Sequence, residues 1–124
     1  MNIFIVEDDQ LLLLMLNRMI TKMGHSVAGT ATNGYDAIAE INKTTPDLIL
    51  MDIILKDEID GITVAETVKK QRNYPIIYIT GNSDSFYKNR ADAIGYHDYL
   101  VKPTSFEKLV NSINKLNQQQ TGSF

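Results

Sequence analysis

The sequence predicts an α/β fold in which five strands alternate with five helices and form a doubly wound, mostly parallel sheet with helices on both faces. Three observations favour this fold. Short apolar runs and longer amphipathic segments alternate five times along the 124 residues. The loops that join them are short, which is typical of strand–helix–strand units. The run at residues 48–51 is apolar without alternation, as expected of a strand buried on both faces.

Two strand–helix units account for the first third of the chain. Residues 2–7 form the first predicted strand, and residues 10–23 have apolar side chains at helical spacing. The stripe on this helix consists of Leu12, Leu16, Met19 and Met23. Residues 25–30 predict a weaker second strand. The turn at residues 33–34 then leads into a second helix, whose apolar positions are Ala37, Ile38 and Ile41.

The middle of the chain predicts a third strand and a third helix. The apolar run at 48–51 is followed by a charged loop at 56–60, and Gly61 then opens a helix. The apolar positions of that helix are Ile62, Ala65 and Val68. Asp60 is the expected N-cap, because aspartate is favoured at that position.

The last third of the chain predicts two further units. A strand at 76–79, a helix at 84–94 and a strand at 97–101 follow in order. A final helix carries Phe106, Leu109, Val110, Ile113 and Leu116 on one face. We therefore assign one domain to residues 1–117. Residues 118–124 form a polar tail, which we expect to be disordered or to be the stub of a linker.

The composition excludes several classes of protein. The net charge of -3 argues against nucleic acid as a direct partner. The absence of cysteine excludes disulfides, thiolate zinc sites and thiol catalysis. The longest purely apolar run, residues 11–16, is far too short to span a membrane, and no basic leader precedes the first apolar run. We therefore expect a soluble cytoplasmic protein.

Four of the predicted strands end in polar side chains. These are Glu7, Asp8 and Asp9 after the first strand, Asp52 after the third, Thr80 at the end of the fourth and Lys102 after the fifth. Because the carboxyl ends of parallel strands line one crevice, we expect these side chains to lie together. Crowded carboxylates repel one another unless a cation intervenes, and Mg²⁺ prefers oxygen ligands. The pattern therefore predicts a site for a divalent cation and a phosphoryl group.

Most of these residues also have a plainer explanation. Asp9 is suited to cap the first helix, Thr80 can be an ordinary turn residue, and Lys102 can be a solvated charge. Asp52 differs, because no helical pattern begins there. Its carboxylate is a candidate nucleophile toward phosphorus, a role that carboxylates fill by forming an acyl phosphate.

Five segments taken together resemble the receiver domain of bacterial two-component response regulators. They are Val6-Glu7-Asp8-Asp9, Leu50-Met51-Asp52, Asp60-Gly61, Ile79-Thr80-Gly81 and Tyr99-Leu100-Val101-Lys102-Pro103. Any one segment is a weak signal, but all five occur in order at the family's spacing, from Met1 to about Leu116. The resemblance implies a flavodoxin-like (βα)5 fold whose five-stranded parallel sheet has the strand order 2-1-3-4-5.

The resemblance implies a phosphoacceptor and a set of metal ligands. Asp52 would take a phosphoryl group from a phosphohistidine on a sensor histidine kinase or a phosphotransfer protein. The same residue would help to bind Mg²⁺, for which Mn²⁺ is an alternative. Asp8 would bind the ion directly and Glu7 through water, and the backbone carbonyl of Ile54 would complete the protein ligands.

The resemblance also implies contacts to the phosphoryl group and a conformational switch. Lys102 and Thr80 would contact the phosphoryl oxygens, and the peptide bond before Pro103 would be cis. Tyr99 would rotate inward as Thr80 moves, and so change the surface formed by the fourth helix, the fifth strand and the fifth helix. The alternative is that Tyr99 is an ordinary aromatic residue of the sheet.

The sequence departs from the family in the loop after Asp52. Lys56 stands where receivers usually have proline, and the stretch from Asp52 to Gly61 is one residue longer than the commonest spacing. The shape of the loop over the metal is therefore open. Ile54 and Asn82 occupy the two positions that tune hydrolysis of the phosphoryl group in this family.

Leucines of the first helix suggest a docking surface. At 100° per residue, Leu14 and Leu11 lie off the apolar stripe and among polar side chains. We expect them to form an exposed apolar spot where the histidine-bearing helices dock, although single exposed leucines are also common. The methionines of this helix, Met15, Met19 and Met23, are expected to fill the core.

The leading function is a phosphorylation-switched signalling domain that acts on no substrate other than its own phosphoryl group. One alternative is a receiver fragment of a larger regulator whose output domain is missing. Another is an aspartyl-phosphate hydrolase of the haloacid dehalogenase type, but those enzymes need a carboxylate at the position of Ile54. A third is a receiver-like scaffold that takes no phosphate, against which the intact acidic residues argue. The kinase, the downstream protein partner and the possibility of a homodimer are left open.

Overall fold

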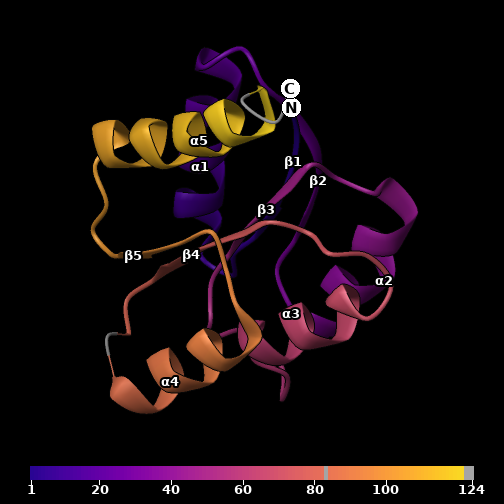
Figure 1. The fold of residues 1–124 in the computed structure, drawn as a ribbon. Coiled ribbons are helices and arrows are strands. Elements are labelled where there is room, and N and C mark those ends of the chain that lie inside the picture. Colours follow the sequence, from indigo (N-terminus) through magenta and orange to yellow (C-terminus); the bar gives the residue numbers. More distant parts are fainter. Residues whose placement is uncertain (83, 122–124) are drawn as a thin grey trace.

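Each predicted apolar run contributes a strand to one parallel sheet. The computed structural model describes residues 1–82 and 84–121 (Figure 1). The strands are β1 (Asn2–Val6), β2 (Ser26–Ala31), β3 (Leu48–Met51), β4 (Ile76–Thr80) and β5 (Asp98–Val101). All neighbouring pairs are parallel, and their order is β2-β1-β3-β4-β5. The predicted fold and strand order are confirmed.

Five helices cover the two faces of the sheet. They are α1 (Gln10–Lys22), α2 (Gly34–Thr44), α3 (Gly61–Lys69), α4 (Ser85–Ile94) and α5 (Phe106–Thr121). Figure 1 shows α1 and α5 together on one side of the sheet and the other three helices on the opposite side. Leu48 and Leu50 of β3 pack toward α1 and α5, whereas Ile49 and Met51 pack into the opposite core. The two-sided burial predicted for this strand is therefore confirmed.

Aspartate and asparagine side chains begin the helices. Asp9 accepts hydrogen bonds from the first turn of α1, so its plainer explanation as a cap is confirmed. Asp60 caps α3 as expected, by accepting a hydrogen bond from the amide of Thr63. Asp84 caps α4 and Asn33 caps α2 in the same way. These caps fix where each helix leaves the crevice at the carboxyl ends of the strands.

Two expectations differ from the structure or go beyond it. Met15 is 45% exposed, so the prediction that it fills the core is wrong; it lies one turn after Leu11 and faces the loop that follows β5. Helix α5 continues through residues 118–121, which the sequence assigns to the polar tail. Glutamine is a good helix former, which favours this extension. The rest of the predicted tail, residues 122–124, lies outside the described residues. None of the described helices is long and apolar enough to cross a bilayer.

Candidate metal and phosphoryl site

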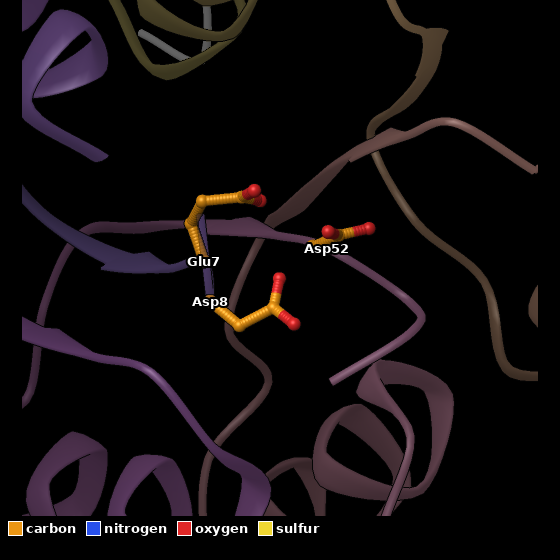
Figure 2. A group of neighbouring side chains, drawn as sticks. All are labelled: Glu7, Asp8 and Asp52. Carbon is orange, nitrogen blue, oxygen red and sulfur yellow. The ribbon is translucent and has the colours of Figure 1, made fainter. Parts of the chain in front are cut away.

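Three carboxylates meet where β1 and β3 end. The two strands are neighbours, with Val6 opposite Met51, and the amide of Asp52 donates to the Val6 carbonyl at 2.9 Å. Figure 2 shows Glu7 and Asp8 reaching from the end of β1 toward Asp52. One ligand oxygen of each residue lies within 4.8 Å of the others. The expectation that strand order would bring these residues together is therefore confirmed.

Lys102 is the cation that the structure places among these carboxylates. Its Nζ donates to Asp52 Oδ2 at 2.9 Å and to the two carboxylate oxygens of Glu7 at 3.0 and 3.2 Å. The peptide bond between Lys102 and Pro103 is cis, as expected. Glu7 is 1% exposed and Asp52 is 6% exposed, whereas Asp8 is half-buried. One ammonium therefore faces three carboxylates in a largely buried position.

The burial of these groups changes their protonation. Burial raises the pKa of Glu7 to about 7, with repulsion from Asp52 adding to the effect and hydrogen bonds from Lys102 opposing it. The pKa of Lys102 is also raised, because its bonds to Asp52 and Glu7 outweigh the burial that would lower it. Lys102 is therefore charged at neutral pH, and Glu7 gives up its proton readily when a further cation is near.

The donor set suits a hard divalent cation. Its oxygens are all carboxylate oxygens, which Mg²⁺ prefers, and no sulfur or imidazole ligand lies among them. After Lys102 is counted, two negative charges are left without a counter-charge if all three carboxylates are ionised. A second cation at this position would remove the repulsion that raises the pKa of Glu7. The residues present therefore fit Mg²⁺.

The loop after β3 closes tightly around the Asp52 backbone. The Ile53 amide donates to Asp52 Oδ1 at 2.7 Å, and the Gly61 amide donates to the Ile53 carbonyl at 2.7 Å. A β-carbon at position 61 would overlap the Asp52 carbonyl oxygen, so glycine is required there. Ile54 follows on the outside of this closure, where its side chain is 45% exposed.

Thr80 and Tyr99 are connected through the loop that follows β4. The Thr80 hydroxyl is buried and accepts a hydrogen bond from the Asn82 amide at 3.2 Å. The Tyr99 hydroxyl donates to the Asn82 carbonyl at 3.1 Å. The amide of Lys102 donates to the Thr80 carbonyl at 2.8 Å. Asn82 therefore joins the two residues that the sequence singles out as a switch.

Tyr99 belongs to a cluster of three tyrosine rings that the sequence reasoning missed. The ring centroids of Tyr78, Tyr96 and Tyr99 are each 5.7 Å apart. Lys88 of α4 lies over both Tyr96 and Tyr99, at 5.2 Å from each centroid. Tyr78 is fully buried, and its hydroxyl has no hydrogen-bond partner among the described residues. The sequence has no periodic signal for this cluster, because Tyr78 lies on β4, Tyr99 lies on β5 and Tyr96 lies just before β5.

The comparisons with known proteins agree with this geometry. The response regulator receiver domain family matches residues 3–114. The chemotaxis protein CheY of Thermotoga maritima is 33% identical over 117 residues, which cover 94% of this chain and 97% of CheY. This chain belongs to the receiver domain family.

Longer relatives and solved structures support the same family. The response regulator ArlR of Staphylococcus aureus is 33% identical over 95% of this chain, and the chain spans about half of its length (53%). The signal receiver domain of a modulated diguanylate cyclase from Desulfovibrio desulfuricans G20 is 30% identical, with a TM-score of 0.89. That match covers 99% of this chain and 98% of the other. Receiver domains are signalling modules of two-component systems rather than conventional enzymes.

A groove on the receiver domain adjoins the carboxylate cluster. Its volume is about 390 Å³, and it lies between α1 and the loop after β5. Its lining includes Leu11, Met15, Lys102 and Pro103. Leu11 is 68% exposed and Leu14 is 48% exposed, so the exposure expected for both leucines is confirmed. Only Leu11 of the two lines the groove, and the docking role of both stays a prediction.

Proposed function

We propose that this receiver domain accepts a phosphoryl group on Asp52 from a phosphohistidine, and that the reaction depends on Mg²⁺. The observation that carries the proposal is the charge imbalance at the end of β1 and β3. Three carboxylates lie together in a largely buried site, and the ammonium of Lys102 among them bonds to Glu7 and Asp52. Such a site favours a second cation, and phosphoryl transfer depends mainly on positioning and charge neutralisation.

Glu7, Asp8, Asp52 and the Ile54 carbonyl are the proposed metal ligands. The three carboxylates are close enough to share one ion. When bound, Mg²⁺ would neutralise the negative charge that develops on the phosphoryl oxygens, and Mn²⁺ has the same preference for oxygen ligands.

Asp52 is the proposed nucleophile. One of its carboxylate oxygens forms a bond to phosphorus as the bond from phosphorus to the donor's imidazole nitrogen breaks, and the electron pair leaves with the imidazole. The Ile53 amide and the Lys102 ammonium hold the two oxygens of Asp52 in a fixed orientation. Lys102 and Thr80 then bind oxygens of the new acyl phosphate, which carries about 1.5 to 2 negative charges.

The same phosphoryl group is proposed to switch the protein. We propose that Thr80 gives up its hydrogen bond from the Asn82 amide as its hydroxyl moves to donate to a phosphoryl oxygen. Asn82 also holds Tyr99 through its carbonyl, so movement of this loop releases the ring. The surface of α4, β5 and α5 would then change for a downstream protein. Phe86 and Val101 lie exposed on these elements.

The experiment for the phosphoacceptor uses a small acyl phosphate as donor. Incubation with acetyl phosphate and Mg²⁺ should add the mass of one phosphoryl group to the wild type, as measured by intact mass spectrometry. The Asp52→Asn variant should gain nothing, and excess EDTA should abolish the gain in the wild type. A wild type that gains no mass, or an asparagine variant that gains it equally, would overturn the proposal.

Leu11 and Leu14 are proposed to contact the helices that carry the phosphohistidine. Both are exposed on α1, and Leu11 lines the groove next to Lys102. Leu14→Glu should slow phosphotransfer from a kinase or phosphotransfer protein and leave labelling by acetyl phosphate unchanged. Phe86→Glu is the matched control, at an apolar residue of α4 that is also exposed (63%, against 48% for Leu14), and it should change neither rate. Equal loss in both assays for Leu14→Glu would contradict a docking role.

Two arrangements of the whole protein are compatible with this function. CheY is matched over nearly its whole length, which favours a receiver that acts alone through a protein partner. ArlR is about twice as long, which favours a receiver joined to an output domain. The intact mass of the protein isolated from its source separates these arrangements.

A further inference from the structure

The loop between β3 and α3 is the part of the chain where the family's pattern is broken. It is one residue longer than the commonest spacing and lacks the usual proline, which would restrict the backbone. Its residues nevertheless alternate regularly in exposure. Ile53 and Leu55 are buried and Asp57 and Ile59 are half-buried, whereas residues 54, 56 and 58 are exposed. Asp57 is therefore the one charged residue on the inward side of the segment 53–59.

Asp57 binds the first turn of α2. Its Oδ1 accepts from the Gly34 amide and its Oδ2 accepts from the Tyr35 amide, both at 3.0 Å. Amides in the first turn of a helix have no partner within the helix. The side chain of the N-cap residue Asn33 accepts a hydrogen bond from only one of these amides, that of Asp36, at 2.9 Å. Asp57 thus completes the cap of a helix that lies more than 20 residues earlier in the chain.

A second contact fixes the loop to the same turn. A β-carbon at Gly34 would lie 2.9 Å from the β-carbon of Ile59 and 3.1 Å from its carbonyl oxygen. The backbone of α2 therefore approaches the loop as closely as a glycine allows. Burial tends to raise the pKa of Asp57, but the hydrogen bonds from the amides of Gly34 and Tyr35 lower it below its ordinary value. Asp57 therefore accepts these hydrogen bonds as an ionised carboxylate.

These contacts leave little freedom around Ile54. On one side, the Ile53 carbonyl is held by the Gly61 amide, and the Ile53 amide is held by Asp52. On the other side, Asp57 and Ile59 are held by α2. Only residues 54–56 lie between the two attachments. The Ile54 carbonyl, which we propose as a metal ligand, is in this short bridge.

We infer that Asp57 is a positioning residue for the metal-binding loop: by capping α2 it holds the backbone of residues 54–56, and with it the Ile54 carbonyl, in place for the ion. This inference rests on the proposed function, because the ion gives the Ile54 carbonyl its role. Asp57 itself does not touch the ion or the phosphoryl group. It takes over the restriction that proline provides in shorter loops of the family.

The test compares two neighbouring acidic residues of the loop. Asp57→Ala and Glu58→Ala each remove one negative charge near the site, but Glu58 is exposed and makes no side-chain hydrogen bond among the described residues. Titration of the ¹⁵N-labelled protein with MgCl₂, followed by NMR, gives the Kd of each variant. Because two charge-assisted hydrogen bonds are lost, we expect Asp57→Ala to weaken Mg²⁺ binding about tenfold. Glu58→Ala should weaken it less than about twofold, since exposed charges are screened.

Amide hydrogen exchange in the metal-free protein gives a separate readout of loop order. The Ile53 and Gly61 amides should exchange faster in Asp57→Ala than in the wild type, and at the wild-type rate in Glu58→Ala. If the alanine variant does not fold, Asp57→Asn takes its place in both measurements, because asparagine keeps one acceptor oxygen. Equal Mg²⁺ affinities for the Asp57 and Glu58 variants, or unchanged exchange at Ile53 and Gly61, would overturn the inference.

The two proposals fail in distinguishable ways. A wild type that binds no Mg²⁺ contradicts the proposed function, and the exchange rates of the metal-free variants then decide whether Asp57 orders the loop. A wild type that binds Mg²⁺ and is phosphorylated, with Asp57→Ala indistinguishable from Glu58→Ala, contradicts the positioning role alone.

Discussion

Two groups of charged side chains lie at the two ends of the loop between β3 and α3, and they differ in charge balance. At the start of the loop, Lys102 contacts Asp52 and Glu7, with Asp8 nearby. At its end, Arg90 of α4 forms an ion pair with one carboxylate of the described residues, that of Asp60, at 2.6 Å for Nη1 to Oδ2 and 3.3 Å for Nη2 to Oδ1. The first group has one cation for three carboxylates, whereas the second has one for one.

The difference shows what separates a reactive group of charges from a structural one. Asp60 also accepts from the Thr63 amide at 2.8 Å, so both of its oxygens are hydrogen-bonded and the pair fixes α4 to the start of α3. In the other group Glu7 is buried, so water cannot stabilise the surplus negative charge. Only a proton or a further cation can neutralise it. The unbalanced group is therefore the one suited to bind metal.

The largest expected effect comes from removing the cation of the unbalanced group. In Lys102→Met, Glu7 and Asp52 are left buried without a counter-charge, so we expect the free energy of unfolding in metal-free buffer to fall by about 3 kcal/mol at a pH of about 8. Urea unfolding with and without Mg²⁺ measures this, and the ion should recover more stability in the variant than in the wild type. Lys56→Met, which removes an exposed lysine of the neighbouring loop, is the control. A similar loss in Lys56→Met would contradict the comparison.

The next effect is a dependence on pH that belongs to Glu7. Its pKa is raised from 4.5 to about 7, so between these values the folded chain binds more protons than the unfolded chain. The stability that Glu7 contributes is therefore fully present below pH 4.5 and is lost as the pH rises to about 7. We expect metal-free wild type to lose about 3 kcal/mol over this range relative to Glu7→Gln.

Chemical denaturation at a series of pH values gives that difference. Saturating Mg²⁺ should flatten or reverse the slope, because the ion requires the ionised carboxylate. A wild type and a Glu7→Gln variant with parallel pH profiles would show that Glu7 is not protonated in the metal-free fold.

A smaller effect is expected at the balanced pair. Arg90→Ala should lower the free energy of unfolding by about 1 kcal/mol, because the pair is hydrogen-bonded but partly screened by solvent. The Kd for Mg²⁺ should not change, since Asp60 is not among the proposed ligands. Arg72→Ala, at an exposed arginine, is the control for removal of a positive charge. Weaker Mg²⁺ binding in Arg90→Ala alone would show that the two groups are coupled.

The smallest effect is the pH dependence of the balanced pair, which has the opposite sign to that of Glu7. Although burial opposes it, hydrogen bonds from Arg90 and Thr63 lower the pKa of Asp60 below its ordinary value of 3.8. The stability from this pair is present above that value and is lost as the pH falls through the lowered pKa. The difference in urea midpoint between wild type and Arg90→Ala should therefore shrink in acid. A difference that stays constant into acid would contradict an ionised Asp60.

Local patterns account for much of what could be predicted from the sequence. The unbroken apolar run at 48–51 and the aspartates at 9 and 60 act within a few residues of their own positions, and the structure agrees with each. The convergence of Glu7, Asp8 and Asp52 could also be predicted, because it follows from strand order once the sheet is parallel.

Contacts between loops could not be predicted in the same way. The hydrogen bonds that Asp57 accepts from the amides of Gly34 and Tyr35 depend on how the loop lies against a helix more than 20 residues earlier in the chain. No periodic pattern in the sequence predicts a contact between residues so far apart in the chain. The prediction that Met15 fills the core is wrong for a related reason. The helical period places it near the apolar stripe, but the surface it faces is a groove beside the loop after β5 rather than the sheet.

The tyrosine cluster makes the protein its own optical probe. The chain has no tryptophan, so its intrinsic fluorescence comes from six tyrosines. Three of them have ring centroids 5.7 Å apart. One of the three, Tyr99, donates a hydrogen bond to the Asn82 carbonyl in the loop after β4. Rotation of Tyr99 would change the surroundings of half of these emitters at once. An unlabelled sample therefore carries a built-in emission signal for the position of this ring.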